Sequence, residues 1–149
     1  MDRFDAKQGQ AILDRISGIP IFRSLKFRII EFAEGFCEAW VPHDRAFDGV
    51  YGSFHGGLLA TVADSVACFA IMTITGPDEP LTTTDFSIRF LAPCLTDVTA
   101  RAQVIKVGKT LCPVGVDLYD AKKRHVAVAQ VTYIRLGDKP RHAPGPPEP

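Results

Sequence analysis

The most continuous apolar stretch of the chain runs from residue 58 to residue 74, and only four polar side chains interrupt it. A glycine-rich turn at residues 51–57 precedes this stretch, and Gly76-Pro77 follows it. A helix that is apolar on every side must be buried on every side. The pattern therefore predicts one long central helix that the rest of the chain wraps.

The other apolar runs are mostly short and alternate with polar positions, as strands do. The exception is residues 6–17, whose apolar positions recur at helical spacing until Gly18. Residues 27–33 and 36–41 are expected to form a hairpin around a glycine turn. Because long strands joined by short turns favour antiparallel pairing over β-α-β units, we expect the strands after the central helix to form a meander. These strands are predicted at residues 81–91, 98–107, 111–119 and 126–136.

These elements predict an α+β domain in which a curved antiparallel sheet wraps one long buried helix. The chain has 149 residues, about the length of one domain. We assign residues 1–136 to a single domain, with residues 1–20 as an N-terminal helical segment. Residues 137–149 are rich in proline and are expected to be a disordered tail.

Seventeen basic and seventeen acidic residues balance to zero net charge, which argues against a general binder of nucleic acid or of membrane surfaces. The first residues are charged and lack the apolar run of a signal peptide. Asp64 interrupts the only stretch long enough to cross a bilayer. We therefore expect a cytoplasmic protein that does not associate with membranes.

The cysteines are widely scattered, and no pair has the close spacing of a zinc or redox motif. We expect reduced packing residues, as in cytosolic proteins, and no metal site. These cysteines are Cys37, Cys68, Cys94 and Cys112.

Asp64 is the anomaly of the central helix, because no lysine or arginine lies one turn away from it. A buried carboxylate without a partner is costly and frequently marks a functional site. Asp64 is therefore the first candidate for chemistry. The structural alternative is a carboxylate satisfied by the backbone or by a distant base.

The start of the helix carries a motif of a glycine, two further residues and His-Gly-Gly. Its members are Gly52, His55, Gly56 and Gly57, and Asp64 follows nine positions after the histidine. This pattern resembles the hotdog-fold acyl-CoA thioesterases of the phenylacetic-acid-degradation (PaaI) type.

Two further segments carry the resemblance. Residues 83–93, which end in Phe-Leu-Ala-Pro, are similar to the strand that follows the helix in that family, and residues 108–110 supply Gly-Lys-Thr between two strands. The similarity extends over residues 19–136 and implies a hotdog fold.

The resemblance implies hydrolysis of an acyl- or aryl-CoA thioester to the free acid and CoA, with no metal or organic cofactor. In the family, the amide of the first glycine, here Gly56, lies against the thioester carbonyl. The acidic residue, here Asp64, acts as nucleophile or as general base on water. A serine or threonine that matches Thr83 assists it.

General chemistry agrees with these roles. The unpaired N–H groups of a helix N-terminus suit a developing oxyanion, and a carboxylate can attack or deprotonate water. On one helix, however, Gly56 and Asp64 would lie roughly 12 Å apart, too far to meet the same carbonyl. We therefore expect a symmetric homodimer with shared active sites. The resemblance extends this expectation to a homotetramer of two dimers.

Several assignments have a structural alternative. His55 either caps the helix or acts as an acid or base, and Gly57 either contacts substrate or permits close packing. Tyr51 and Phe54 either line an acyl pocket or cover the core. Lys109 follows a turn glycine, where it either meets a CoA phosphate or is an ordinary surface residue.

One position departs from the family. The family usually has Asn or Gln six residues before the histidine, where this chain has Gly49, so Asp48 or Tyr51 would have to replace the amide. This departure keeps an acyl-CoA-binding sensor as an alternative, although Asp64 opposes it. A hotdog hydratase or dehydratase is a second alternative, for which His55 would be the base.

Overall fold

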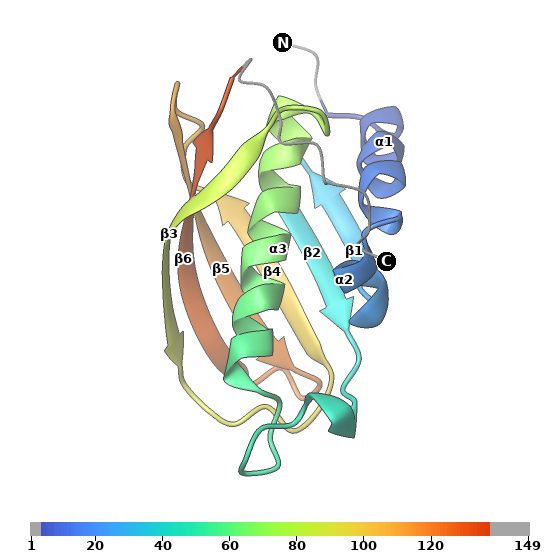
Figure 1. Ribbon diagram of the computed structural model, residues 1–149, viewed down its shortest axis with the longest axis vertical. Coiled ribbons are helices and arrows are strands. Elements are labelled where there is room, and N and C mark those ends of the chain that lie inside the picture. The colour runs from blue at the N-terminus through green and yellow to red at the C-terminus, as the bar shows by residue number, and fades with distance from the viewer. Residues whose placement is uncertain (1–3, 138–149) are drawn as a thin grey trace, which may run out of the picture.

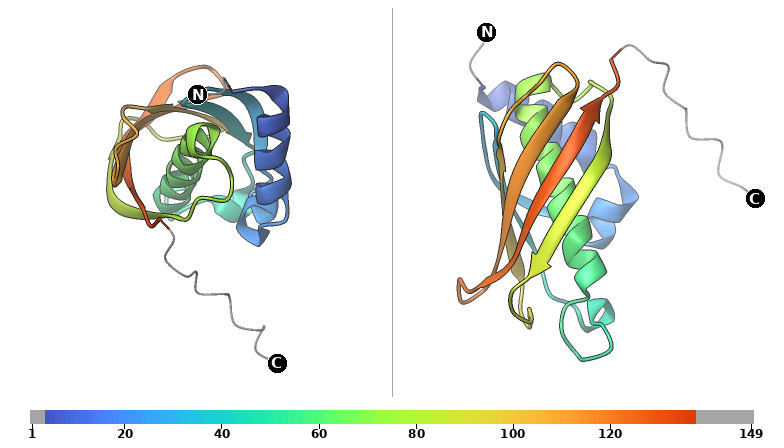
Figure 2. Two further views of the ribbon diagram at one scale, coloured as in Figure 1. Left: turned by 90° about the horizontal axis from the view of Figure 1, so that it is seen from above. Right: turned by 90° about the vertical axis from the view of Figure 1, so that its left-hand side faces the viewer.

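A long helix, α3 (Gly56–Thr75), lies along the concave face of a six-stranded antiparallel sheet in the computed structural model, which describes residues 4–137 (Figure 1). Viewed from above, the sheet curls around α3, and the N-terminal helices cover one flank (Figure 2). The predicted α+β architecture is confirmed. The remaining helices are α1 (Ala6–Ser17), α2 (Pro20–Ser24) and the 3-10 helix η1 (Arg45–Phe47). The strands are β1 (Arg28–Ala33), β2 (Phe36–Val41), β3 (Leu81–Phe90), β4 (Val98–Val104), β5 (Leu111–Asp120) and β6 (His125–Arg135).

The strand order β1-β2-β4-β5-β6-β3 corrects the predicted meander. Strands β4, β5 and β6 pair in sequence as expected, but β3 pairs with β6 at the far edge of the sheet. The other edge of β4 is occupied by β2. Short-range turn signals predict strands and hairpins, yet they carry no information about which strand closes the edge.

Local signals set the helix ends. Asp5 caps α1 by accepting from the Gln8 amide, and the Gln8 side chain accepts from the Asp5 amide in return. Pro20 does not simply end α1 but occupies the first position of α2, where its missing N–H costs nothing. The sequence pattern did not predict α2.

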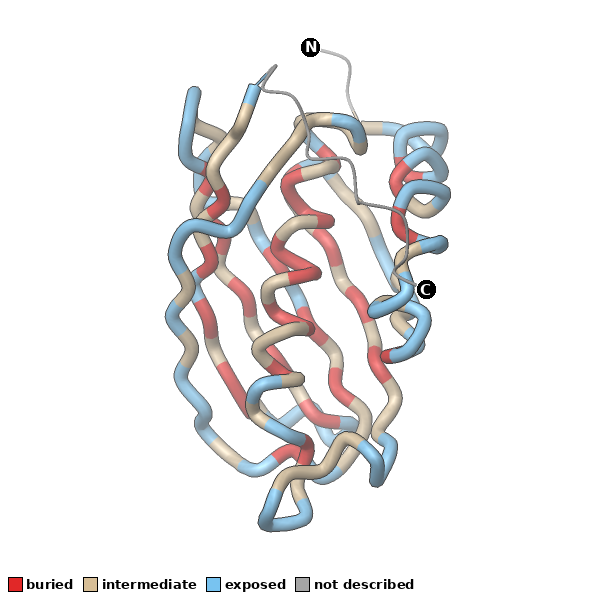
Figure 3. Tube along the Cα trace, in the orientation of Figure 1, coloured by how far each residue is buried: buried red, intermediate tan, exposed pale blue. Residues whose placement is uncertain are grey.

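Residues 65–67 and 69–71 of α3 are buried, so burial extends well around this helix but does not enclose it. The prediction that the helix is buried on all sides was therefore wrong for a single chain. Figure 3 shows the buried segments of α3 concentrated in the turns away from its N-terminal end. A half-buried stripe runs along another side at helical spacing, through Thr61, Asp64, Cys68 and Met72. One chain therefore leaves a helix face with both polar and apolar side chains incompletely covered.

By length and composition alone, α3 is apolar enough to cross a membrane, so the prediction that Asp64 excludes a span was too strict. The core helix of a soluble protein passes the same test, and half of the relevant window of α3 is buried inside the domain.

The four cysteines are free, and three of them, Cys37, Cys94 and Cys112, are buried. The predicted tail at residues 137–149 lies outside the described residues except for Gly137. The domain boundaries stay a prediction.

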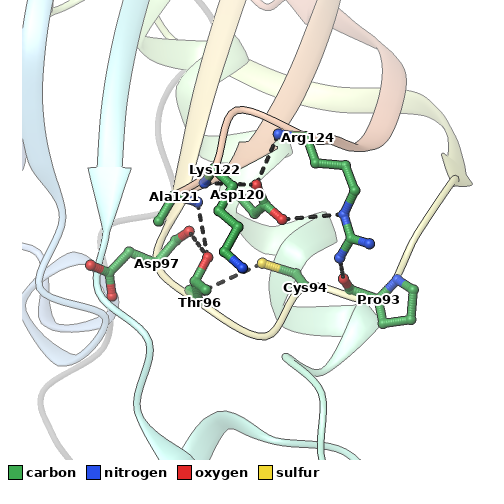
Figure 4. Close-up of polar contacts among 8 residues, drawn as sticks. All are labelled: Pro93, Cys94, Thr96, Asp97, Asp120, Ala121, Lys122 and Arg124. Carbon is green, nitrogen blue, oxygen red and sulfur yellow. Dashed lines mark hydrogen bonds and ion pairs between the residues drawn. The ribbon is translucent and has the colours of Figure 1, made fainter.

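The buried carboxylate of Asp120 ties together the connections at one end of the sheet (Figure 4). Its Oδ1 accepts from the Lys122 and Arg124 amides at 2.9 and 2.8 Å, and its Oδ2 lies 3.3 Å from Nε of Arg124. The Arg124 guanidinium also donates to the Pro93 carbonyl at 2.9 Å. These bonds fix the β5–β6 turn against the connection from β3 to β4.

That connection in turn holds the segment that leads into α3. The Cys94 carbonyl accepts from the Phe54 amide at 2.8 Å, and the His55 amide donates to the Phe47 carbonyl at 2.8 Å. The Asp120 network therefore reaches the start of the central helix through one backbone hydrogen bond.

We expect Asp120→Asn to lower the melting temperature at neutral pH. Hydrogen bonds, that from the Arg124 amide first, hold the pKa of Asp120 below its ordinary value. A carboxyl group with a lowered folded-state pKa stabilises the protein above its unfolded-state pKa and loses this effect as pH falls through the folded-state pKa. The melting difference between the variant and the wild type should therefore shrink below about pH 4.

Asp117→Asn is the matched control, since Asp117 forms an exposed ion pair with His125. Exposed pairs of this kind contribute little, so its melting temperature should stay close to that of the wild type. Equal melting curves for Asp120→Asn and wild type at pH 7 would contradict the clamping role.

Candidate active site

The first turn of α3 leaves one backbone donor free. His55 is the N-cap: its Nδ1 accepts from the Gly57 amide at 2.9 Å, and its carbonyl accepts from the amides of Leu58 and Leu59, both at 3.0 Å. Within residues 4–137 the Gly56 N–H has no hydrogen-bond acceptor. It is a donor at the positive end of a long helix, which suits an anionic oxygen.

The free amide borders an apolar groove of about 390 Å³. A Cβ atom at Gly56 would lie 3.2 Å from the Phe90 ring, so the absence of a side chain keeps this approach open. At Gly57 a Cβ would lie 3.0 Å from the His55 ring, so this glycine permits the cap. The groove is lined by Ser53, Phe54, Gly56, Leu59, Phe90, Leu91, Ala92, Pro93 and Cys94.

The Asp64 carboxylate lies in the middle of α3, is half-buried, and is hydrogen-bonded through one oxygen. Its Oδ1 accepts from Thr83 Oγ1 at 2.8 Å and lies 2.9 Å from the Tyr133 hydroxyl. Its Oδ2 has no partner in the described part of the chain. The expectation of a buried, unpartnered carboxylate was therefore wrong, because neutral hydroxyls from β3 and β6 replace the missing base.

A β-bulge puts Thr83 on the helix-facing side of the sheet. The register of β3 against β6 shifts between Thr83 and Asp85, so that Thr83 pairs with Tyr133 while Phe86 pairs with Val131. Simple alternation would place Thr83 and Phe86 on opposite faces. One extra residue reverses the phase and brings both to the inner face.

A second groove, of about 400 Å³, begins one helical turn beyond Asp64. Cys68 lies in it, and burial, together with the charge of Asp64, raises the pKa of the Cys68 thiol to about 12. The thiol therefore stays protonated at neutral pH and is a poor nucleophile beside Asp64. The groove is lined by Arg15, Cys68, Met72, Pro77, Glu79, Pro80, Leu81, Thr82 and Leu136.

The structure joins Asp64 to Thr83 but does not bring them to Gly56. Both ends of the expected machinery lie on α3, which is continuously helical from Gly56. Eight residues of helix separate Gly56 from Asp64 by roughly 12 Å. Within one chain, the free N–H and the carboxylate cannot contact one thioester carbonyl.

The substrate-binding candidates are dispersed. Tyr51 is 95% exposed, whereas Phe54 is 3% exposed and packs beside Phe47 while also bordering the first groove. Asp48 is engaged with His43 at 2.7 Å. Lys109 is exposed at the opposite end of α3 from His55, next to the Thr110 carbonyl that accepts from Arg135.

Gly49, which replaces the Asn or Gln usual in the family, lies next to the residue that caps α3. A Cβ there would lie 3.6 Å from the His55 ring. The carboxylate of Asp48 is held by His43, and Tyr51 extends into solvent, so neither side chain replaces an amide at this point. Among residues 4–137, no group of three or more His, Cys, Asp or Glu is arranged to hold a metal ion.

A family model described as the thioesterase superfamily matches residues 51–127, which include the His-Gly-Gly turn, α3, β3, and Asp64 with Thr83. The chain belongs to the thioesterase superfamily. This thioesterase is 32% identical over 97 residues to acyl-coenzyme A thioesterase 13 of Homo sapiens and of Pongo abelii. The alignment covers 62% of the chain and 67% of each relative. The family and these relatives make the protein a thioester hydrolase.

Solved structures agree with this membership. A thioesterase family protein from Silicibacter pomeroyi aligns with a TM-score of 0.79 at 27% identity, over 85% of this chain and 96% of that one. The PaaI protein of the E. coli phenylacetic acid degradation operon aligns with a TM-score of 0.82 at 23% identity, over 90% and 96%. The predicted hotdog fold is confirmed.

Sequence reasoning missed Tyr133. Its run on β6 alternates inward-facing apolar residues, and a tyrosine at an inward position needs a partner for its hydroxyl. This need for a hydrogen-bond partner is the sequence signal that could have identified Tyr133 as a candidate site residue.

We expect His55→Ala to lower the free energy of unfolding by about 1 kcal/mol, because the variant loses the helix cap. His55→Asn should recover most of this loss, since asparagine is a good N-cap and its side chain accepts from the same amide. Denaturant unfolding measures both variants, and thioester hydrolysis is assayed beside it. Loss of hydrolysis in a stable His55→Asn variant would instead give the imidazole a chemical role.

Proposed function

We propose that this thioesterase hydrolyses aliphatic acyl-CoA thioesters to the free acid and CoA. Asp64 would deliver oxygen as nucleophile or general base, and the Gly56 amide would stabilise the oxyanion. One observation carries the proposal: the Gly56 N–H and the Asp64 Oδ2 are the two groups such a reaction needs, and neither has a partner in the described chain.

The proposal requires two chains. Because Gly56 and Asp64 are roughly 12 Å apart on one helix, a second, antiparallel α3 has to supply the missing half of each site. A symmetric dimer would complete two sites at once.

Two surfaces support this assembly. The outer edge of β3 has no strand neighbour in the described chain, and exposed edges of this length are normally covered. Phe90 and Leu91 at its end are 52% and 53% exposed, and the Phe90 ring lies close to Gly56 at the start of α3. A dimer of dimers remains a proposal that rests on the resemblance.

Asp64 can produce the free acid and CoA by two routes, as a general base or as a nucleophile. As general base, Asp64 Oδ2 takes a proton from water while the water oxygen bonds to the thioester carbon, and negative charge develops on the carbonyl oxygen against the Gly56 N–H of a second copy. Collapse then breaks the C–S bond, and the CoA thiolate takes the proton from Asp64. As nucleophile, Oδ2 bonds to that carbon directly, CoA leaves as the thiolate, and water hydrolyses the resulting anhydride. Both routes use the free oxygen of Asp64.

The second groove supports an aliphatic acyl group. Its lining includes the apolar Cys68, Met72 and Leu81, and none of the described residues that line it is aromatic and able to stack against an aryl ring. Its volume of about 400 Å³ is within the usual range of ligand pockets. We further propose contact of Lys109 with a CoA phosphate, and a cytoplasmic location consistent with four free thiols.

We expect Asp64→Asn to abolish most thiol release from a panel of alkyl- and aryl-CoA substrates while acyl-CoA binding persists. Removal of a catalytic group of this kind typically costs about 10²–10⁴-fold in rate. Free thiol is measured continuously and binding by calorimetry. Wild-type turnover in the variant would remove Asp64 from the chemistry, and binding without turnover in the wild type would favour the sensor.

Gly56→Pro and Gly56→Ala form a matched pair. Both place a Cβ near Phe90, but only proline removes the N–H, and proline is tolerated at the first helical position. We expect Gly56→Pro to lose about 100-fold or more in kcat, and Gly56→Ala to lose much less.

Shared sites predict complementation. Co-expressed Asp64→Asn and Gly56→Pro chains would form mixed dimers in which one site has both wild-type halves, and random mixing restores about a quarter of the sites. Activity no higher than the sum of the separate variants would contradict the shared site.

A further inference from the structure

The hydroxyl of Tyr133 lies against Asp64 from the sheet side. It is 2.9 Å from Oδ1 and 2.8 Å from the backbone carbonyl of the same residue. The tyrosine is on β6 and is only 5% exposed, so packing against the core fixes its ring. Both acceptors belong to Asp64, so the single hydroxyl proton binds that residue whichever oxygen takes it.

Tyr133 acts as a donor at this position. Burial raises the pKa of its phenol, so the hydroxyl keeps its proton at any physiological pH. Thr83 Oγ1 donates to the same Oδ1 at 2.8 Å from the neighbouring strand. Two hydroxyls from two adjacent strands therefore lie within hydrogen-bond distance of one carboxylate oxygen, and the Tyr133 proton is shared between that oxygen and the Asp64 carbonyl.

These contacts with Oδ1 also determine the orientation of Oδ2, the other carboxylate oxygen of Asp64. A carboxylate rotates about its terminal bond over a broad range unless hydrogen bonds fix it. With Oδ1 held toward the sheet, Oδ2 is directed away from both donors and remains without a partner in residues 4–137. A reacting oxygen has to keep a narrow approach to the carbonyl carbon, and a small misplacement is costly.

We infer that Tyr133 is a positioning residue for thioester hydrolysis, which together with Thr83 fixes Oδ1 of Asp64 and so selects Oδ2 as the reacting oxygen. This inference rests on the proposed catalytic role of Asp64. The inference gives a role in the site to a residue of β6, in addition to Asp64 on α3 and Thr83 on β3.

The test is a double-mutant cycle between Tyr133→Phe and Asp64→Asn. Phenylalanine keeps the ring and removes only the hydroxyl. We expect kcat to fall by about 10–100-fold with KM almost unchanged, because the carboxylate loses its orientation and substrate contacts stay intact. In the Asp64→Asn background, the same substitution should change the residual rate little, since its target is gone.

The controls separate positioning from general damage. Tyr119→Phe, on β5, keeps the stacking of that ring on His125 and should leave kcat unchanged. Thr83→Val removes the other donor to the same oxygen and should reproduce the fall in kcat at constant KM, which provides a second test should Tyr133→Phe fold poorly. Circular dichroism melting verifies that each variant is folded.

Two results would overturn the inference: wild-type kcat in folded Tyr133→Phe, or equal losses in the wild-type and Asp64→Asn backgrounds, which indicate a structural role only. Failure of the proposed function has a different signature, since Asp64→Asn alone would then leave turnover intact.

Discussion

The rigidity of α3 is the constraint on which the remainder of the site depends. A helix keeps its residues at fixed spacing, so a donor in its first turn and a carboxylate two turns later cannot approach each other. The sheet cannot solve this problem, because it only bends around the helix. Under the proposed function, the incompletely covered face of α3 and the outer edge of β3 would be the surfaces that contact a second copy.

Much of the fold was predictable because short-range patterns of apolar and polar residues determine its helices and strands. The apolar run of residues 58–74 predicted α3, and alternation predicted each strand to within a few residues. The position of β3 at the far edge was not predictable, since no local signal states that it pairs with β6 and not with β4. That pairing joins residues far apart in the sequence, such as Thr83 and Tyr133, which no short-range pattern encodes.

The residues of the candidate site also differ in how far local sequence patterns could predict them. His55, Gly56 and Asp64 are visible in the sequence because one helix contains them at fixed spacing. Tyr133 was not, because its contact with Asp64 spans 69 positions and depends on the register between two strands. Thr83 is an intermediate case: its residue type fits the family, but its direction depends on a bulge that alternation alone does not reveal.

Under the proposed function, the placement of both half-sites on one helix would also link activity to protein abundance. If each complete site needs two copies of α3, a lone chain is inactive however well it folds. At chain concentrations far below the dimer dissociation constant, the number of working sites then rises with the square of the concentration. A weakly paired enzyme of this kind would remain nearly silent at low expression and become active over a narrow range of synthesis, with no regulator bound.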